Sequence, residues 1–439
     1  MRGHVLLISM LLSAAAIAQA PPSATGVVST TPMAIPPPVS GLNYTIQLGS
    51  EVKHNYLRGG VAFTASYIDN YLADSASPPE SETTLSILPS MAFDTATARQ
   101  HVLVAYNPGF TFYQPSSQLN EVDNIVAANY AFHLSEHTTI SAVERFQDSS
   151  SPFSPSDIGV GGISGTLVSD TPGAIPPFAK ILTNTVSPEI TMQTGLNEMI
   201  GASGSWTILH YPNSSQTPGL YDSNSRGGTA FYNHRISNAQ YVGVTYQFMD
   251  MLTTFNDNES ATRTSTIMGY LTLYAKGRFS LSVSGGPQYY QVVEAPLPSL
   301  STWGPAISAS TGWQSQRVSL AASYSHSVTG ANGLIGGYHT NIGNAAVRWQ
   351  FARTWTAGAS GLYAINKSVS STLTTGTGNG HSVSGSAMLQ HPIHGQVSLA
   401  FNYDRVHESY SQIAALAANP NADRVSVSLN WNFQRPLGR

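Results

Sequence analysis

The sequence contains no cysteine among its 439 residues. Without a thiol the chain can form no disulfide, bind no metal through thiolate and carry no lipid on an N-terminal cysteine. Charged residues are also scarce, at 10% of the chain, whereas roughly a quarter is usual in soluble proteins. The formal net charge of -4 supplies no basic field, so nucleic acid is not expected as a partner.

Long apolar runs are missing as well, once the first 20 residues are passed. No later stretch approaches the roughly 20 consecutive apolar residues that a membrane-spanning helix requires. The mean hydropathy is nevertheless -0.07, because Ser, Thr, Gly, Asn and Gln take the place of charged residues. A barrel wall with lipid on one side and a polar, mostly uncharged lumen on the other fits this composition, so membrane crossing is expected through strands.

The N-terminus has the pattern of an export signal. In residues 1–20, Arg2 precedes an apolar stretch that ends in small residues, which is typical of a secretory signal peptide, with cleavage expected before Gln19. Residues 21–42 are rich in Pro, Ser and Thr and are interpreted as a disordered periplasmic segment. The remainder, residues 43–439, is expected to be the folded domain.

From about Gly60 onward, apolar and polar residues alternate with a period of two, in segments long enough to cross a bilayer as tilted strands. In the stretch from Phe279 to Tyr289, one face is apolar and the other is small and polar. The stretch from Val425 to Phe433 repeats this pattern and ends on aromatic residues. We count about 18 such segments (a range of roughly 16 to 18), although a soluble β-sandwich could explain any one of them alone. The expected strands lie near residues 60–69, 84–94, 100–113, 121–134, 137–148, 186–196, 199–210, 227–236, 239–249, 263–275, 278–290, 303–313, 316–326, 340–351, 354–365, 382–391, 395–405 and 423–433.

The connections between these segments alternate between short and long. This predicts an all-β, transmembrane, antiparallel up-and-down β-barrel in the bacterial outer membrane, with short periplasmic turns and long extracellular loops. Apolar and polar residues also alternate over residues 43–52. If this stretch is a spanning strand, one of the other predicted strands must be wrong, because an even number of strands is expected. The long connections are expected at residues 70–83, 149–185, 211–226, 250–262, 291–302, 327–339, 366–381 and 406–422.

Several short motifs carry a resemblance to a known family. They are Tyr67-Ile68-Asp69-Asn70, Ile87-Leu88-Pro89, Tyr106-Asn107-Pro108-Gly109-Phe110 and His133-Leu134-Ser135-Glu136-His137. With these motifs the chain resembles the uncharacterised outer-membrane barrels of acidobacteria, which are similar in turn to barrels from polysaccharide-export and exosortase-associated gene neighbourhoods. The resemblance covers residues 60–155 by motif and the rest by strand rhythm. It implies an outer-membrane barrel and, as one alternative, an accessory role in surface polysaccharide export.

One departure from the usual ending of such barrels is visible. Many end on a Phe that the outer-membrane insertion machinery reads, whereas here Gln434 to Arg439 follow Phe433. The machinery is still expected as a partner, together with outer-membrane lipid.

No catalytic constellation stands out. His234 and Ser237 resemble a phospholipase motif, but a spacing of three places them on opposite faces of a regular strand. The pairs His133 with His137 and His391 with His394 lack a nearby carboxylate at ligand spacing and are interpreted as turn residues. We therefore expect no enzyme activity, no cofactor and no metal site.

The leading hypothesis is a porin-like channel for passive diffusion of small solutes, in which residues 149–185 form a constriction loop or, equally well, an external loop. Alternatives are the polysaccharide-export barrel, for which aromatic residues along one lumen path would be the distinguishing feature, and a non-conducting adhesion or scaffold barrel. Candidate lumen-lining charges are sparse and mixed in sign, so they predict no ion preference. They are Asp94, His101, His133, Glu189, Arg317, Arg348, Asp404 and Arg424.

Overall fold

The computed structural model describes most of the chain from residue 54 onward. The described ranges are 54–71, 80–150, 180–213, 220–255, 258–275, 278–294, 298–315, 317–330, 333–369, 379–410 and 421–437. The expected signal peptide (1–20), the Pro-rich segment (21–42), the possible strand at 43–52 and most of the 149–185 connection lie outside these ranges. Among the described residues, no helix has both the length and the apolar character needed to span a membrane.

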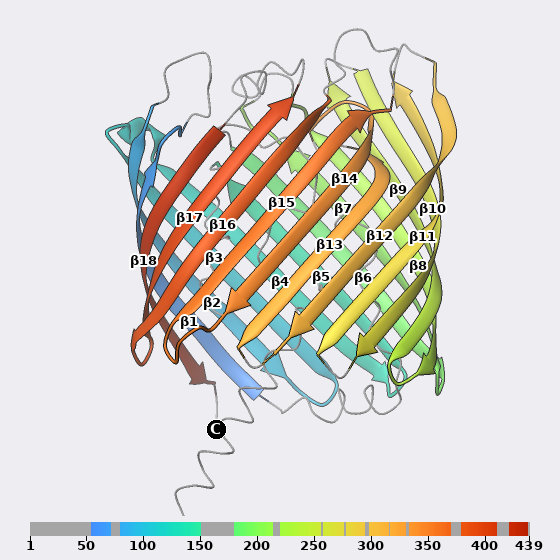
Figure 1. Cartoon of the computed structure of the whole chain (residues 1–439), viewed down its shortest axis with the longest axis horizontal. Coiled ribbons are helices and arrows are strands. Elements are labelled where there is room, and N and C mark those ends of the chain that lie inside the picture. Colours follow the sequence, from blue (N-terminus) through green and yellow to red (C-terminus); the bar gives the residue numbers. More distant parts are fainter. Residues whose placement is uncertain are drawn as a thin grey trace, which may run out of the picture.

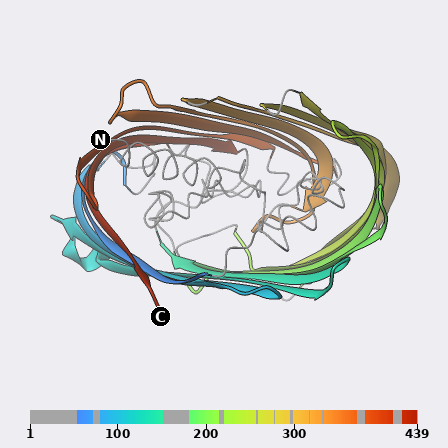
Figure 2. The same cartoon turned by 90° about the horizontal axis from the view of Figure 1, so that it is seen from below.

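The described residues form one antiparallel sheet of 18 strands that closes on itself, since β1 pairs with both β2 and β18 (Figure 1). Seen along the axis, the wall is a flattened ring (Figure 2). The predicted barrel class and strand number are thereby confirmed. The strands are β1 His54–Ile68, β2 Glu82–Ala96, β3 Gln100–Gln114, β4 Glu121–Ser135, β5 Thr138–Ser149, β6 Ile181–Gly195, β7 Glu198–His210, β8 Ser223–Ser237, β9 Gln240–Phe255, β10 Asn258–Ala275, β11 Phe279–Glu294, β12 Leu300–Gln314, β13 Val318–Gly330, β14 Gly337–Trp349, β15 Thr356–Ser368, β16 Gly380–His394, β17 Val397–Tyr410 and β18 Asn421–Pro436; a short 3₁₀ helix, η1 Ser117–Leu119, precedes β4.

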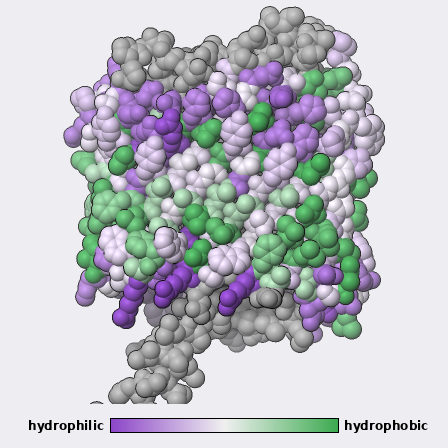
Figure 3. All heavy atoms as spheres, viewed as in Figure 1, coloured by the Kyte–Doolittle hydropathy of each residue, from purple (hydrophilic) through white to green (hydrophobic). Residues whose placement is uncertain are grey.

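Alternation along each strand separates the two faces of the wall. On β1, Phe63 and Tyr67 are 53% and 51% exposed, whereas Ala62 and Thr64 between and beside them are 0% and 3% exposed. Because successive side chains point to opposite faces, the exposed apolar set lies outside and the small polar set inside. On the face of the molecule seen in Figure 3, apolar side chains accordingly gather across the middle and lower part of the outer surface. A closed barrel with this surface is built to span a membrane, because no backbone edge is left for lipid to meet.

Several aromatic side chains on the outer face are anchored between strands. Each donates a hydrogen bond to a polar side chain on the next strand, as aromatic side chains with one polar end commonly do. The pairs are Tyr106 with Asn124 (2.9 Å), Trp206 with Asn224 (2.8 Å), Tyr246 with Ser265 (3.5 Å), Tyr324 with Asn341 (2.9 Å) and Tyr403 with Asp423 (2.6 Å).

The two rims differ in their connections. One rim, the short-turn edge, holds tight turns such as residues 136–137, 196–197, 238–239 and 395–396. The chain enters β1 and leaves β18 at this edge. The opposite rim is the long-loop edge. Its expected connection at 250–262 is wrong, because β9 and β10 pair up to Phe255 and Asn258. Asp250 and Glu259 of this stretch lie on the outer face of the strand pair.

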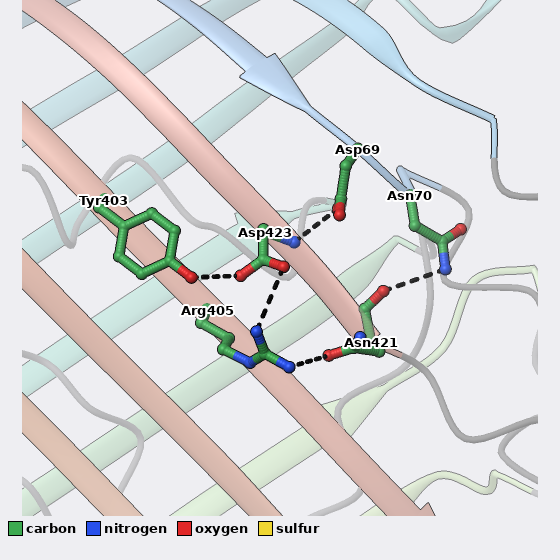
Figure 4. A network of polar contacts seen from close by, with 6 residues as sticks. All are labelled: Asp69, Asn70, Tyr403, Arg405, Asn421 and Asp423. Atoms are coloured by element: carbon green, nitrogen blue, oxygen red, sulfur yellow. Dashed lines mark hydrogen bonds and ion pairs between the residues drawn. The ribbon is translucent and has the colours of Figure 1, made fainter.

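The seam of the barrel is closed by pairing and by a polar network at the long-loop edge. β1 and β18 pair from Tyr56 with Pro436 to Ile68 with Arg424. Beyond this ladder, the Asp69 carboxylate accepts the backbone N–H of Asp423 (2.7 Å), and Asp423 also accepts from Tyr403 and Arg405 (Figure 4). The first strand is therefore fastened to the last two in the sequence.

Candidate functional site

The pairing of the wall is interrupted where β13 leaves β12. The two strands pair only from Gln314 with Ser319 to Ile307 with His326, whereas β13 and β14 stay paired as far as Gly330 with Gly337. The end of this pair turns from the ring into the lumen (Figure 2). We call residues 327–330 and 333–340 the inward hairpin. The sequence predicted a loop over 327–339, but residues 327–330 and 337–339 are strand, and the hairpin lies inside the barrel.

The inward hairpin is bound to the inner face of β9 to β11. Gln288 on β11 donates to the Val328 carbonyl (2.9 Å) and accepts the Val328 N–H (2.7 Å). The hydroxyl of Thr253 on β9 donates to the Leu334 carbonyl (3.5 Å). Gln288 thus satisfies the backbone groups of Val328 that β12 does not reach, as buried backbone groups require.

At its tip the hairpin contributes to an apolar cluster with distant parts of the wall. Leu334 and Tyr338 are buried together with residues at the ends of β7 and β17 and in the connection after β7. The N–H of Tyr221 also donates to the Gly333 carbonyl (2.9 Å). Burial, with Glu408 and Asp222 nearby, raises the pKa of the Tyr211 phenol above its ordinary value, so this hydroxyl stays protonated. The remaining members of the cluster are Leu209, Tyr211, Leu220 and Tyr410.

A series of hydrogen bonds between hydroxyl and amide groups connects the hairpin to β15 and β17. Thr329 and Thr340 share a hydrogen bond across the hairpin (3.1 Å), and Thr340 donates to the Asn366 amide oxygen (3.0 Å). The Asn366 amide then donates to the Tyr410 hydroxyl (2.7 Å). All four side chains are buried and uncharged. The hairpin is therefore held by β9 to β11 on one side and by β15 and β17 on the other.

Two glycines permit this packing. A Cβ on Gly330 would lie 2.0 Å from the Met251 Cε and 3.3 Å from its Cβ, so any side chain here would displace the buried Met251 side chain. Gly333 has a φ of 80°, the left-handed region, and packs against Tyr211. At the root, the rings of His326 and His339 stack with centroids 6.3 Å apart, and Tyr290 meets His339 edge-on.

The candidate lumen charges Asp94 and His101 lie together near the short-turn edge. Asp94 accepts from His101 Nε2 (2.9 Å) and forms an ion pair with Arg58 (2.8 Å). Register places all three on the inner face of β1 to β3. His133 lies on the same face of β4, with Nδ1 3.0 Å from the Thr139 hydroxyl.

Asp404 and Arg424 form a direct pair on the inner face, nearer the long-loop edge. They are register partners on β17 and β18, with Arg424 Nε and Nη2 3.0 and 2.8 Å from Asp404 Oδ2, and their side chains are only 14% and 8% exposed. Glu189 lies elsewhere on the inner face, opposite Ser141 and Ser203. The eight candidates therefore form no single site.

Arg317 does not belong to a strand. It is exposed in the turn between β12 and β13, so the alternation that suggested a lumen position does not apply to it. Arg348 has the register of the inner face, opposite Ser319, but lies at the exposed end of β14.

Other chemistry considered from the sequence finds no geometry to support it. His234 faces outward beside Glu198 (3.8 Å), and the Ser237 hydroxyl accepts the Ala239 N–H in the turn that follows β8. Within the described ranges, no three His, Asp or Glu side chains gather in a way that could hold a metal ion.

The inward hairpin was missed as a functional element. Gln288 was assigned correctly to the polar face of its strand but not singled out, because its partner is a backbone 40 residues away. The available signal was the glycine-rich run from Gly330 to Tyr338, which allows close backbone approach.

No protein-family model matches the sequence, and no curated protein does either. The structure is similar to OccAB4 of Acinetobacter baumannii, with a TM-score of 0.43, 8% identity and coverage of 88% of this chain and 99% of that one. It is similar to the outer-membrane protein OpdK of Pseudomonas aeruginosa (0.41, 8%, 86% and 99%) and to the unliganded ferric citrate transporter FecA (0.44, 12%, 87% and 66%). Likeness at these identities concerns the fold alone. The resemblance to acidobacterial and polysaccharide-export barrels finds no support in these comparisons.

Proposed function

We propose that the protein is an outer-membrane channel for passive diffusion of small polar solutes, and that the inward hairpin is its constriction. The observation that carries this proposal is the position of the inward hairpin, which leaves the wall and binds β9 to β11 while its tip packs with residues of β7 and β17. A segment folded into the lumen of an 18-stranded barrel narrows a space that would otherwise admit large molecules.

The pairing of the candidate lumen charges supports uncharged polar solutes. Asp404 and Arg424 neutralise each other on the inner wall, and Asp94 pairs with Arg58 and His101. A ring of like charge, the usual source of ion selectivity, is not formed by the candidate lumen charges. Weak selectivity between cations and anions is therefore expected.

Single-channel recording of the refolded mature protein in planar bilayers tests the proposal. Replacing residues 328–339 by a short Gly-Ser turn is expected to raise the conductance several-fold, because the hairpin no longer occupies the lumen. A second variant lacking residues 155–180 tests the earlier candidate constriction, most of which lies outside the described residues. If only the second variant conducts more, the constriction lies in residues 149–185 and not in the hairpin.

A second candidate, passage of carbohydrate chains, is favoured by one observation. Aromatic side chains line the inner face of β8 to β11, where Tyr241 and Tyr274 meet edge-on with centroids 5.7 Å apart. Three of the five rings are buried, which limits the surface for stacking on sugars. Block of the channel by added oligosaccharides would support this candidate, and a folded protein without conductance would contradict both. The five residues are Phe231, Tyr241, Tyr270, Tyr274 and Tyr290.

A further inference from the structure

Arginines gather on one arc of the short-turn edge. Arg278, Arg317 and Arg353 lie in the turns after β10, β12 and β14, and Arg435 lies near the end of β18. All four are exposed, and Arg435 has the outward register, opposite Leu57. Figure 3 shows hydrophilic side chains along this lower edge of the molecule, beneath apolar ones. We call these four residues the arginine rim.

Each arginine of the rim has aromatic side chains beside it in the chain. Phe279 follows Arg278, Trp313 precedes Arg317, and Trp431 and Phe433 precede Arg435. Around Arg353 the rings form a row, with centroid distances of 5.5 Å between Trp349 and Phe351 and 6.5 Å between Phe351 and Trp355. Trp313, Trp349 and Trp431 are exposed on the outer face. Aromatic side chains thus lie within four positions of each of the four arginines.

The charge of the rim is not balanced locally. Within the described residues, none of the four guanidinium groups forms an ion pair. The sequence around them carries no acidic residue, so no neighbour along the chain could supply one. This holds for residues 271–280, 311–320, 346–360, 388–399 and 430–439.

By contrast, arginines on the outer face of the long-loop edge have acidic partners. Asp250 accepts from Arg263 (3.1 Å), and Asp423 accepts from Arg405 (3.5 Å). Asp250 is also the direct register partner of Arg226. The excess of positive charge is therefore a property of one rim and not of the whole outer surface.

We propose that the arginine rim binds the headgroups of anionic phospholipids in the leaflet that meets the short-turn edge. Aromatic belts lie at the headgroup level of a bilayer, so the guanidinium groups just beyond these rings stand at the height of lipid phosphates. Guanidinium binds phosphate by paired hydrogen bonds and is less strongly hydrated than ammonium. An acidic protein partner would need charge alone, whereas lipid also explains the rings above each arginine.

The tryptophans of the rim make the test direct, because four of the six in the chain, at 313, 349, 355 and 431, lie beside these arginines. The mature protein is reconstituted in phosphatidylcholine vesicles containing a minor fraction of phosphatidylglycerol, with bromine on the acyl chains of one lipid or the other. Wild type is expected to show tryptophan quenching that corresponds to an enrichment of phosphatidylglycerol of about threefold or more. Raising salt from about 0.1 M to about 1 M should reduce this enrichment.

Two variants complete the test, each checked for folding by heat-modifiable mobility. The rim variant combines Arg278→Gln, Arg317→Gln, Arg353→Gln and Arg435→Gln. In this variant the tryptophan quenching per mole of brominated lipid should be equal for the two lipids. The matched control removes four charges from the long-loop edge by Lys180→Gln, Arg226→Gln, Arg263→Gln and Lys367→Gln, and should keep the enrichment. Equal quenching per mole of the two lipids in wild type would overturn the proposal. An equal loss of phosphatidylglycerol enrichment in both variants would overturn it as well. If the rim variant does not fold, the salt dependence of wild type alone decides.

Discussion

At the scale of single residues, the inner wall shows how this barrel carries charge at low cost. Asp404 and Arg424 neutralise each other across adjacent strands while both are largely buried. Arg58 and Asp94 do the same near the other rim, with His101 as a further partner. Because a buried charge without its partner is expensive, these pairs stabilise the wall only as long as both members are present.

Removing one carboxylate from the inner pair is expected to destabilise the barrel. Asp404→Asn should lower the free energy of unfolding by about 3 kcal/mol, because the buried Arg424 loses its ion pair and two hydrogen bonds with this carboxylate. Asp250→Asn is the control, since its pair with Arg263 is 34% and 54% exposed and should cost less than about 1 kcal/mol. Urea unfolding of the protein in lipid vesicles, followed by tryptophan fluorescence, measures both. Equal losses would contradict the distinction.

At the scale of elements, the inward hairpin is formed by the ends of two wall strands that leave the sheet together. β13 and β14 keep their mutual pairing to the tip, so the hairpin satisfies its own backbone within the pair. Its outer edge is satisfied by Gln288, and its tip by Tyr221 and Thr253. A strand pair can leave a sheet in this way only if other groups replace the lost ladder.

The close approach of Gly330 to Met251 allows the packing of the hairpin against β9 to be tested. Gly330→Val should push the hairpin away from β9, because the new side chain would overlap Met251, and larger or more fluctuating single-channel currents are expected. Gly343→Val is a matched control in the wall part of the same strand pair, since a Cβ there meets nothing within 4 Å. Currents that are unchanged in Gly330→Val, with the protein folded, would indicate that the hairpin does not limit conduction.

At the scale of the whole molecule, closure depends on the pairing of the first strand with the last. The ladder between β1 and β18 brings residues more than 350 positions apart into direct register. The two rims also differ in charge, with the arginine rim at one end and the charged network of Figure 4 at the other. A barrel of this kind therefore has a defined orientation in the membrane, set by its surface at both ends.

The absence of cysteine allows the closure to be tested by crosslinking. Ser66→Cys with Ser426→Cys places two thiols at register partners across the seam, where a disulfide is geometrically possible. Oxidation of the refolded protein should close this bond and alter the mobility of the denatured chain. Ser66→Cys with Asn430→Cys, four residues out of register, should not crosslink. Crosslinking of the second pair instead of the first would show a different closure.

Much of the architecture follows from the sequence alone. The alternation from Phe279 to Tyr289 and from Val425 to Phe433 determined which side chains face lipid, because strand geometry fixes a period of two and lipid accepts only one kind of face. The scarcity of charge and the rhythm of the segments determined the barrel class and the number of strands. The faces of the strands, the barrel class and the strand number could all be predicted without knowing that the first strand pairs with the last.

The function of particular residues was decided only by the tertiary structure. Apart from its glycine-rich run, the sequence of the inward hairpin does not differ from that of an external loop, since the groups that hold it inside, Gln288, Thr253 and Tyr410, lie on other strands. Likewise, the four arginine and aromatic pairs are far apart in the chain and share one rim only because the strands have matched lengths and register. Local pattern sets the face of each strand, whereas contacts between distant strands set what the faces enclose.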